Sequence, residues 1–567
     1  MPCGTPRPLV VTHASFLYAV QIVPIEVKSG PAGRLRSLHQ LLLEHPERDP
    51  GIVLSTRPYA ELPEQRLVFV PLYYAGPSHS STATRDAARA CGRGRRDNLV
   101  VQQNRRTKSI VISLPKRNNT RHMRRLVDQK LMEWRDSPRR KPLMVRGARQ
   151  VGKTYSVLDF GRTAFGGRVH QIDLELRRDA HAAFGEDISP PVVLRRLQAI
   201  LGVEVVPGRD LLFLDEIQAC PRAITALRYF YELMPELHVA AAGSLLEFAV
   251  GEHSFPVGRI DYLHMRPLTF VEYLRAIGNE PAADVVEAGP SSTDEVIHEV
   301  LLRHLRDYFF VGGMPAAVRS FVDSGAMLDA FALQDAIVAT YRDDFSKYGV
   351  RVDKDCLDAV LRSTARSVGQ QVMYSRLAAG YRGQVVKRCV DLLTRARVVE
   401  RVPSASPAGL PLAASPGHGR FKATLLDIGL MQRLNAMPHD IDITTASLLS
   451  LYRGALAEQF VGQELRAALR DPPMGDALHY WSRAGEARGS SAEVDYLVAM
   501  KERIVPIEVK SGPAGKLRSL HLLLREYPHC APGLVLSEAP YAELPDQGLV
   551  FVPLYYAGSL DRLIGGS

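Results

Sequence analysis

One run of the sequence restricts the fold more than any other feature. Residues 142–160, PLMVRGARQVGKTYSVLDF, have the pattern of an apolar strand, the spacing G-x-x-x-x-G-K-T and then a helix. In this setting Gly147 and Gly152 let the backbone wrap around phosphates, so that successive N–H groups face anionic oxygens. Lys153 would supply a positive charge to the β- and γ-phosphates, and the Thr154 hydroxyl would reach Mg²⁺. The sequence therefore predicts an ATP and magnesium site on an α/β domain, lined by Gly147, Ala148, Arg149, Gln150, Val151, Gly152, Lys153 and Thr154.

A second run supplies the acidic half of such a site. In LLFLDEIQ, residues 211–214 have the continuous apolar character of a buried parallel strand, and Asp215 and Glu216 follow at its C-terminal end. Carboxylates at that end of a parallel strand lie beside the crevice that holds the phosphates. We expect Asp215 to hold the Mg²⁺ shell and Glu216 to orient and polarise the attacking water. The pattern predicts hydrolysis, with binding without turnover as the alternative.

Two further side chains are candidates for contact with the γ-phosphate. The strand pattern LHVAAAGS ends in Ser244, which is either a γ-phosphate sensor and ATP contact or part of a strand-end turn. Arg259, in PVGRIDYL, is a candidate arginine finger, acting within its own chain or across a subunit interface of a homo-oligomer. A surface or salt-bridged arginine is the alternative for Arg259.

The length and composition of the chain indicate several soluble domains. A chain of 567 residues is too long for one ordinary core, and contents of 46% hydrophobic and 23% charged residues are typical of globular proteins. No run approaches the roughly 20 apolar residues that a membrane span needs. The N-terminal residues lack the pattern of a signal peptide. The six cysteines are scattered without a C-x-x-C pair, which argues against a disulfide framework or zinc cluster and predicts a cytoplasmic location.

The positive charge is concentrated in one segment. The net charge is +10, and residues 77–125 hold thirteen Lys or Arg against two Asp, a surplus of eleven, so the rest of the chain is near neutral. This segment is rich in Ser, Arg and Asn. We interpret residues 77–120 as a basic flexible linker. The alternative is an arm that contacts phosphates, with an affinity that falls steeply with salt.

Part of the sequence occurs twice. Residues 22–76 reappear as residues 504–558, with 43 of 55 positions identical. Each copy has the pattern strand, amphipathic helix, strand, strand. The N-terminal copy keeps an E-x-K run but has no acid at the position of Asp495 and no preceding helix. We therefore expect residues 1–76 to be a truncated duplicate of a C-terminal half-domain, either a fusion relic or a piece that pairs with another chain's incomplete sheet.

The C-terminal part carries a second set of chemically suggestive residues. Strand alternation in RIVPIEVKS places Glu508 and Lys510 on one face, and a hairpin can bring Asp495 beside Glu508. Glu458 comes from the flanking helix pattern LYRGALAEQFVGQELRAAL. Two carboxylates and a lysine are what metal-dependent phosphodiester cleavage needs, because the acids hold Mg²⁺ and the metal lowers the pKa of its water. Asp495 and Glu508 are thus the candidate metal ligands, and Glu458 and Lys510 complete the candidate catalytic set.

The middle of the chain has the pattern of a helix-turn-helix. Residues 362–402 predict two short helices, a glycine-containing turn and a third helix with Lys387 and Arg388. The runs RVVERV and FKATLLDIGL, separated by a Pro/Gly/Ser loop, predict the hairpin of a winged helix. The third helix would lie in a major groove of DNA. Alternatively, the module makes protein–protein or inter-domain contacts.

Several of these runs together resemble a known family. RGARQVGKT, LLFLDEIQ, AGSLLEFAVGE, PVGRIDYLHMRPLTFVEYL and YFFVGGMPAAV occur in this order. Over residues 121–558 the chain resembles the AAA-type ATPases of bacteria and archaea that carry a C-terminal domain of unknown function. This resemblance implies an AAA-like ATP-binding core, a winged helix and a nuclease-like C-terminal module. Asp495, Glu508 and Lys510 resemble the core of the PD-(D/E)xK nuclease superfamily, with Glu458 as its helical glutamate and Val494 in place of a proline.

The patterns and the resemblance predict an α/β protein in six parts. These are residues 1–76 (truncated duplicate), 77–120 (basic flexible linker), 121–290 (P-loop AAA-type ATPase core), 291–349 (helical lid region), 350–435 (winged helix) and 451–560 (restriction-endonuclease-like α/β domain). The leading hypothesis is a cytoplasmic ATPase whose ATP state controls a module acting on DNA. The alternative is an ATP-dependent switch whose nuclease-fold domain is inactive and only binds nucleic acid or a protein partner. A membrane partner is not expected.

Overall fold

The chain divides into two compact units, Met1–Thr120 and Arg121–Ser567, in a computed structural model. The structure describes residues 123–244, 258–290, 293–345, 353–412, 420–436, 446–469, 478–483, 492–500, 502–512 and 516–560, and the backbone of six strands in the first unit. In the part of the chain that the structure describes, no helix is both long and apolar enough to cross a membrane.

The first unit contains a four-stranded sheet and a separate hairpin. The sheet has the order β1-β2-β4-β3, with β1 (Ile25–Val27), β2 (Gly51–Ser55), β3 (Ala60–Leu62) and β4 (Leu67–Pro71). The hairpin pairs β5 (Val100–Asn104) with β6 (Ser109–Ser113) in antiparallel fashion. Both strands lie within residues 77–120, the segment interpreted as a basic flexible linker, and carry β-branched residues in VVQQN and SIVIS. That interpretation stays a prediction.

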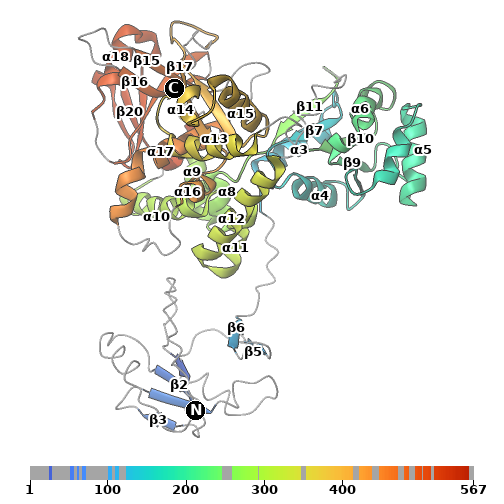
Figure 1. Cartoon of the computed structure of the whole chain (residues 1–567), viewed down its shortest axis with the longest axis horizontal. Coiled ribbons are helices and arrows are strands. Elements are labelled where there is room, and N and C mark those ends of the chain that lie inside the picture. The colour runs from blue at the N-terminus through green and yellow to red at the C-terminus, as the bar shows by residue number, and fades with distance from the viewer. Residues whose placement is uncertain are drawn as a thin grey trace. The chain divides into compact units, whose positions relative to one another are not determined.

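A five-stranded parallel sheet forms the first part of the second unit. Its order is β11 (Asp261–His264), β7 (Leu143–Arg146), β10 (His238–Ala242), β9 (Leu211–Asp215) and β8 (Val169–Asp173), and every neighbouring pair is parallel. Strands β9 and β10 are buried along their whole length, as continuous apolar runs in a parallel sheet should be. Since all five strands run the same way, the loops that follow β7, β9 and β10 meet at one edge of the sheet (Figure 1).

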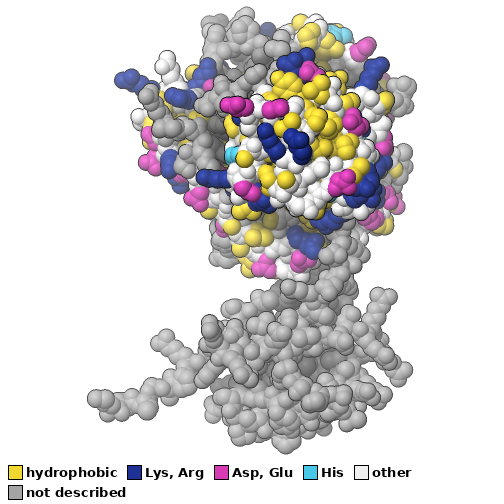
Figure 2. All heavy atoms as spheres, turned by 90° about the vertical axis from the view of Figure 1, so that its right-hand side faces the viewer, with side chains coloured by type: hydrophobic (Ala, Val, Ile, Leu, Met, Phe, Trp, Pro, Cys, Tyr) yellow, Lys and Arg dark blue, Asp and Glu magenta, His cyan; other side chains and the backbone are white. Residues whose placement is uncertain are grey.

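Helices cover both faces of this sheet. Helices α3 (Leu126–Asp136) and α4 (Lys153–Ala164) pack with Val145 on one face, whereas α5 (Pro190–Leu201) and α6 (Pro221–Leu233) pack with Met144 on the other. Adjacent residues of β7 thus belong to two separate apolar clusters, because successive side chains of a strand point to opposite faces of the sheet. The α/β class predicted for this part is confirmed. Figure 2 shows that charged side chains of both signs and apolar side chains are interspersed on its outer surface.

Five helices follow the parallel sheet, and a three-stranded sheet with its own helices comes next. The five are α8 (Phe270–Ala276), α9 (Glu280–Ala288), α10 (Glu295–Val311), α11 (Pro315–Ser324) and α12 (Met327–Asp344). After them come α13 (Lys354–Arg366), β12 (Val372–Met373), α14 (Tyr374–Leu377), α15 (Gly383–Arg395), β13 (Val399–Pro403), β14 (Arg420–Leu425) and α16 (Ile428–Leu434). The predicted hairpin is present as the antiparallel pair β13 and β14.

The C-terminal part is a mixed sheet with two helices. Helix α17 (Ala446–Ala468) leads into β15 (His479–Arg483), β16 (Ala492–Met500), β17 (Arg503–Val509), α18 (Arg518–Glu526), β18 (Gly533–Ser537), β19 (Ala542–Leu544) and β20 (Leu549–Pro553). The sheet order is β15-β16-β17-β18-β20-β19. Its second half, β17-β18-β20-β19, repeats the order β1-β2-β4-β3 of the first unit, so the duplication in sequence is also one of topology.

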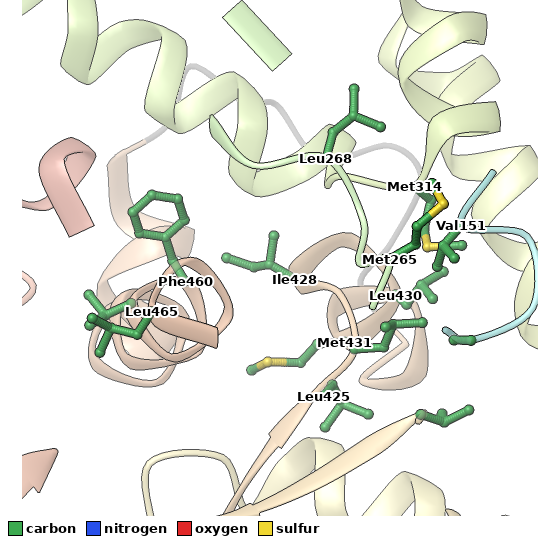
Figure 3. Close-up of a cluster of buried hydrophobic side chains, with 14 of the residues drawn as sticks. Val151, Met265, Leu268, Met314, Leu425, Ile428, Leu430, Met431, Phe460 and Leu465 are labelled. Atoms are coloured by element: carbon green, nitrogen blue, oxygen red, sulfur yellow. The ribbon is translucent and has the colours of Figure 1, made fainter. Parts of the chain in front are cut away.

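One apolar core runs through most of the second unit. It contains Val151 beside the parallel sheet, Met314 between helices, Leu430 of α16 and Phe460 of α17. Figure 3 shows Val151, Met265 and Met314 lying together next to Leu430. The parallel-sheet domain and the C-terminal half are therefore joined by direct packing of buried side chains.

Candidate functional site

The loop between β7 and α4 has a backbone that requires its glycines. Gly152 lies in the left-handed region with φ of 95°, directly before the first turn of α4. A Cβ atom at Gly147 would lie 2.3 Å from the carbonyl oxygen of Met265, which is closer than any side chain tolerates. These constraints fix the path of residues 147–154, the P-loop, as a tight turn leading into a helix N-terminus.

Lys153 and Thr154 begin α4 and connect the P-loop to β9. The Lys153 side chain is buried, and its Nζ donates hydrogen bonds to the carbonyl oxygens of Gly147 (3.1 Å) and Ala148 (2.8 Å). The Thr154 hydroxyl donates to Oδ2 of Asp215 at 2.9 Å. The structure thus brings the two halves of the predicted site together.

Glu216 and Ser244 lie at the same edge of the sheet. The carboxylate of Glu216 accepts hydrogen bonds from Nε2 of Gln218 (2.6 Å) and the hydroxyl of Ser244 (3.3 Å). Gln171 of β8 donates to Asp215 at 3.0 Å. Burial raises the pKa of Asp215, partly offset by the hydrogen bond from Thr154. Gln171 and Gln218 were not predicted from sequence, since a glutamine at a strand end has no distinctive signal.

The residues present fit ATP with magnesium. The turn exposes backbone N–H groups at the start of α4, the Lys153 ammonium lies against the loop, and one hydroxyl and one carboxylate adjoin each other at Thr154 and Asp215. Mg²⁺ is typically held by one or two protein oxygens together with phosphates and water. Within the described ranges no group of three or more His, Cys, Asp or Glu side chains could hold a metal ion.

Two arginines brace the P-loop. Arg125 was missed by sequence reasoning, and Arg149 was predicted to line the nucleotide site but not to pair with a distant helix. Arg125, buried under the loop, donates to the carbonyl oxygen of Val151 (3.3 Å) and to the carboxylate of Glu272 (2.9 Å). Arg149, within the loop, forms an ion pair with Asp344 of α12 at 2.6 Å. Both partners are distant in sequence, so no local pattern could have indicated them.

Arg259 lies far from the P-loop of its own chain. It precedes β11, and β11 runs parallel to β7 with Asp261 opposite Leu143. Because the P-loop follows the other end of β7, Arg259 is at the opposite edge of the sheet, where its Nε contacts Glu232 at 2.5 Å. The role of an arginine finger within the same chain is therefore wrong. The role across a subunit interface stays a prediction.

Comparison with known proteins agrees with this geometry. Residues 139–274 match the family described as AAA domain, which spans the P-loop, Asp215 and β11. This part of the chain is therefore similar to AAA domains. Residues 302–440 and 453–556 match two families described only as domains of unknown function (DUF8612 and DUF4143). No curated protein matches the chain.

Solved structures with a likeness to this chain are distant. A Walker-type ATPase of Pyrococcus abyssi is 14% identical with a TM-score of 0.36, over 55% of this chain and 96% of that chain. The Orc1 protein of Aeropyrum pernix in complex with DNA is 14% identical with a TM-score of 0.24, over 56% and 94%. The RuvB Holliday junction branch migration motor of Thermotoga maritima is 16% identical with a TM-score of 0.25, over 49% and 89%. Likenesses this distant say nothing about what the present chain does.

The predicted C-terminal residues lie close together. Strands β16 and β17 are antiparallel with Tyr496 opposite Ile507, so the next pair in register is Asp495 and Glu508. The backbone N–H of Val509 donates to Oδ2 of Asp495 at 2.9 Å, and Nζ of Lys510 pairs with Glu508 at 2.6 Å. Burial, followed by the charge of Asp495, raises the pKa of Glu508 to about 7.

Lys422 of β14 occupies the centre of this acidic cluster. Its Nζ lies 2.5 Å from Glu458, 2.8 Å from Glu493 and 3.0 Å from Asp495. Burial by itself lowers the pKa of Lys422, but the three carboxylates raise it overall well above its usual value. Neither Lys422 nor Glu493 was predicted from sequence, although a single lysine inside the apolar run FKATLL is a usable signal.

This arrangement does not fit a divalent metal. The oxygens that would bind Mg²⁺ at Asp495 and Glu458 already surround an ammonium group. The metal role predicted for Asp495 and Glu508 is therefore not supported in this form of the protein. Sequence spacing could not reveal that a lysine from another sheet enters the cluster.

Other predicted features lie on the surface or outside the described residues. Lys387 and Arg388 are exposed on α15. The family-specific run AGSLLEFAVGE lies mostly outside the described residues, as do the side chains of the first unit, including its E-x-K run.

Proposed function

We propose that the AAA domain binds ATP with Mg²⁺ and hydrolyses it, and that the nucleotide state is passed to the C-terminal half. The hydrogen bond between Thr154 and Asp215 carries this proposal, because it unites the hydroxyl and the carboxylate that a nucleotide-bound Mg²⁺ needs. Bound Mg²⁺ would neutralise charge on the phosphates. Lys153 would leave its carbonyl partners to contact the β- and γ-phosphates.

Glu216 is the proposed residue for orienting the attacking water. Its carboxylate is held by Gln218 and Ser244, so its direction depends on two neighbours at the phosphate edge of the sheet. Both hydrogen bonds end on Oε2 of Glu216, so a γ-phosphate that draws the Ser244 hydroxyl away would leave this oxygen held by Gln218 alone, while Oε1 is the oxygen that would accept a proton from water. On this basis we propose that Ser244 senses the γ-phosphate.

A path of ion pairs and buried contacts leads away from the P-loop. Arg149 pairs with Asp344 at the end of α12, and Arg342 of the same helix pairs with Asp358 of α13 at 2.6 Å. We propose that nucleotide binding shifts α12 through Arg149 and thereby moves α13 with the module that follows.

A second connection runs through the glycines of the GGMP run. The buried carboxylate of Asp427, which caps α16, accepts a hydrogen bond from the backbone N–H of Gly313 at 2.6 Å. Leu268, in the loop after β11, donates its backbone N–H to the carbonyl oxygen of Gly313 at 2.6 Å. The AAA domain, the helical region and α16 therefore meet at Gly313, which supports a mechanical link between them.

The C-terminal half is proposed to act on DNA through a winged helix. The order α13, β12, α14, α15, β13, β14 and the exposed Lys387 and Arg388 support this assignment. For the nuclease-like domain, the lysine inside the acidic cluster favours the second candidate function. In that candidate the domain is an inactive fold that binds nucleic acid or a protein partner.

Phosphate release by the full chain tests the ATPase proposal. With ATP and Mg²⁺, wild type should turn over, and Lys153→Ala should lose ATP binding. Glu216→Gln should keep ATP binding and lose about 10²-fold or more in turnover. Glu236→Gln, at an exposed glutamate of the same domain, is the matched control. Equal turnover by wild type and Glu216→Gln would remove Glu216 from the mechanism, and tight ATP binding without phosphate release would leave a binding-only switch.

A further inference from the structure

A lysine from one module is sequestered in another. Lys422 belongs to β14, whereas its three acidic partners come from α17 and β16 of the C-terminal sheet. The lysine is 2% exposed. A buried charge is tolerated only where it is paired and hydrogen-bonded, and an ammonium group has three donors to satisfy. Glu458, Glu493 and Asp495 supply one acceptor each.

The backbone holds Lys422 in place. Strand β14 is the central strand of its sheet, in the order β12-β14-β13, and Lys422 pairs with Val402 of β13. Its neighbours Phe421 and Ala423 are buried. The strand that carries Lys422 is therefore held on both sides by neighbouring strands and by its own buried side chains.

The same oxygens cannot serve two cations. A divalent metal in this cluster would need Glu458 and Asp495, which already contact Lys422. A second cation placed on them would meet an ammonium group within contact distance, and the repulsion in a buried site is strong.

We propose that Lys422 is the resident cation of the acidic cluster, taking the place of a divalent metal and joining the β13–β14 hairpin to the C-terminal sheet. While the hairpin is docked, the cluster takes up no metal. Removal of the ammonium leaves Glu458, Glu493 and Asp495 without their shared cation, beside Glu508, which pairs with Lys510. Oxygen Oε2 of Glu508 is buried without a hydrogen-bond partner among the described residues, so it is available to an incoming cation. This inference does not rest on ATP turnover, which Lys153→Ala tests separately.

Binding of Mn²⁺ to the nucleotide-free full chain tests the proposal. Wild type, Lys422→Met and Lys516→Met are compared by calorimetry and by electron paramagnetic resonance of free Mn²⁺. Lys516 is an exposed lysine of the same domain, so its substitution controls for the loss of one charge. The P-loop is identical in all three, and any difference belongs to the cluster. Lys422→Met should gain one Mn²⁺ site per chain, and the double variant Lys422→Met/Asp495→Asn should lose it.

Two outcomes would overturn the proposal. One is a folded Lys422→Met protein that gains no Mn²⁺ site. The other is wild type that binds Mn²⁺ at a site abolished by Asp495→Asn. If Lys422→Met does not fold, the comparison of wild type with Asp495→Asn still decides, because the proposal requires that the two bind Mn²⁺ equally.

Discussion

The guanidinium of Arg149 in the P-loop lies 2.6 Å from the carboxylate of Asp344, the last residue of α12. The contact spans almost two hundred residues of sequence, and the hydroxyl of Tyr341 adds a hydrogen bond of 2.7 Å to the Arg149 carbonyl oxygen. A loop that must rearrange around phosphates is thus tied at both its side chain and its backbone to a single helix. A displacement of the P-loop would therefore displace the end of α12 as well.

Asp344→Asn should weaken this connection. The carboxylate is buried while Arg149 is partly exposed, so we expect a loss of about 1–3 kcal/mol in the free energy of unfolding. We also expect the increase in the free energy of unfolding caused by ATP to differ from that of wild type, because the P-loop is no longer ion-paired with α12. Denaturant unfolding with and without ATP measures both effects. Asp329→Asn, at an exposed aspartate in the first turn of the same helix, should keep the wild-type response to ATP. Identical ATP stabilisation in Asp344→Asn and wild type would argue against the coupling path.

Arg259→Ala tests whether subunits share a site. Arg259 is at the sheet edge opposite its own P-loop, so it can reach a γ-phosphate only in another chain. Arg259→Ala and Glu216→Gln should each lose turnover by at least 10²-fold as pure proteins. An equal mixture should regain part of the activity, because Arg259→Ala subunits keep Glu216 and Glu216→Gln subunits keep Arg259. Full turnover by the pure Arg259→Ala protein would exclude Arg259 as an arginine finger and leave it only as the ion-pair partner of Glu232.

The nucleotide site could be predicted from sequence because its parts are local patterns. The P-loop and the run ending in Asp215 each combine a strand with residues directly beyond it, and a parallel sheet brings such ends together. Their partners come from elsewhere. Arg125 and Asp344 contact the P-loop only after the chain has passed through many intervening elements, so spacing carries no information about them.

The C-terminal cluster shows the limit of the same reasoning. Strand alternation correctly placed Asp495 beside Glu508, because the hairpin between β16 and β17 is short and its register is fixed. It could not show that Lys422 would enter the cluster from another sheet. The run LVFVPLYYA was interpreted as one final strand, but β20 ends at Pro553. Tyr555 and Tyr556 lie in a 3₁₀ helix, residues Leu554–Ser559, because their rings are buried against the core instead of alternating across the sheet.

Glu464 should make the stability depend on pH. Its carboxyl group is buried on α17, and burial raises its pKa to about 8. The hydrogen bond from the backbone N–H of Phe270 acts in the opposite direction and lowers the pKa. Glu272, which is paired with Arg125, is a further negative charge nearby. Between its unfolded pKa of about 4.3 and about 8, the folded state binds more protons than the unfolded state. The contribution of Glu464 to stability is therefore present below this window and is lost as the pH rises through it.

Glu464→Gln isolates this effect. The amide oxygen can still accept from Phe270, while the ionisable group is gone. Relative to wild type, the variant should become progressively more stable as the pH rises from about 5 to 8, by several kcal/mol at roughly 1.4 kcal/mol per pKa unit. Denaturant unfolding of both proteins at four pH values measures the difference. A difference that is constant with pH would mean that Glu464 does not change its protonation in this range.

Lys387 and Arg388 should contribute to DNA binding if α15 lies against a duplex. Both are exposed on a helix whose opposite face, with Val386, Cys389 and Val390, is buried. A lysine or arginine on a phosphate releases counterions, so Lys387→Ala and Arg388→Ala should each weaken binding across all sequences and reduce the salt slope by about one. Fluorescence anisotropy with duplex DNA at several salt concentrations measures this slope. Arg303→Ala, at an exposed arginine of α10, is the control and should keep it. An unchanged slope in both α15 variants would assign this helix to protein contacts instead.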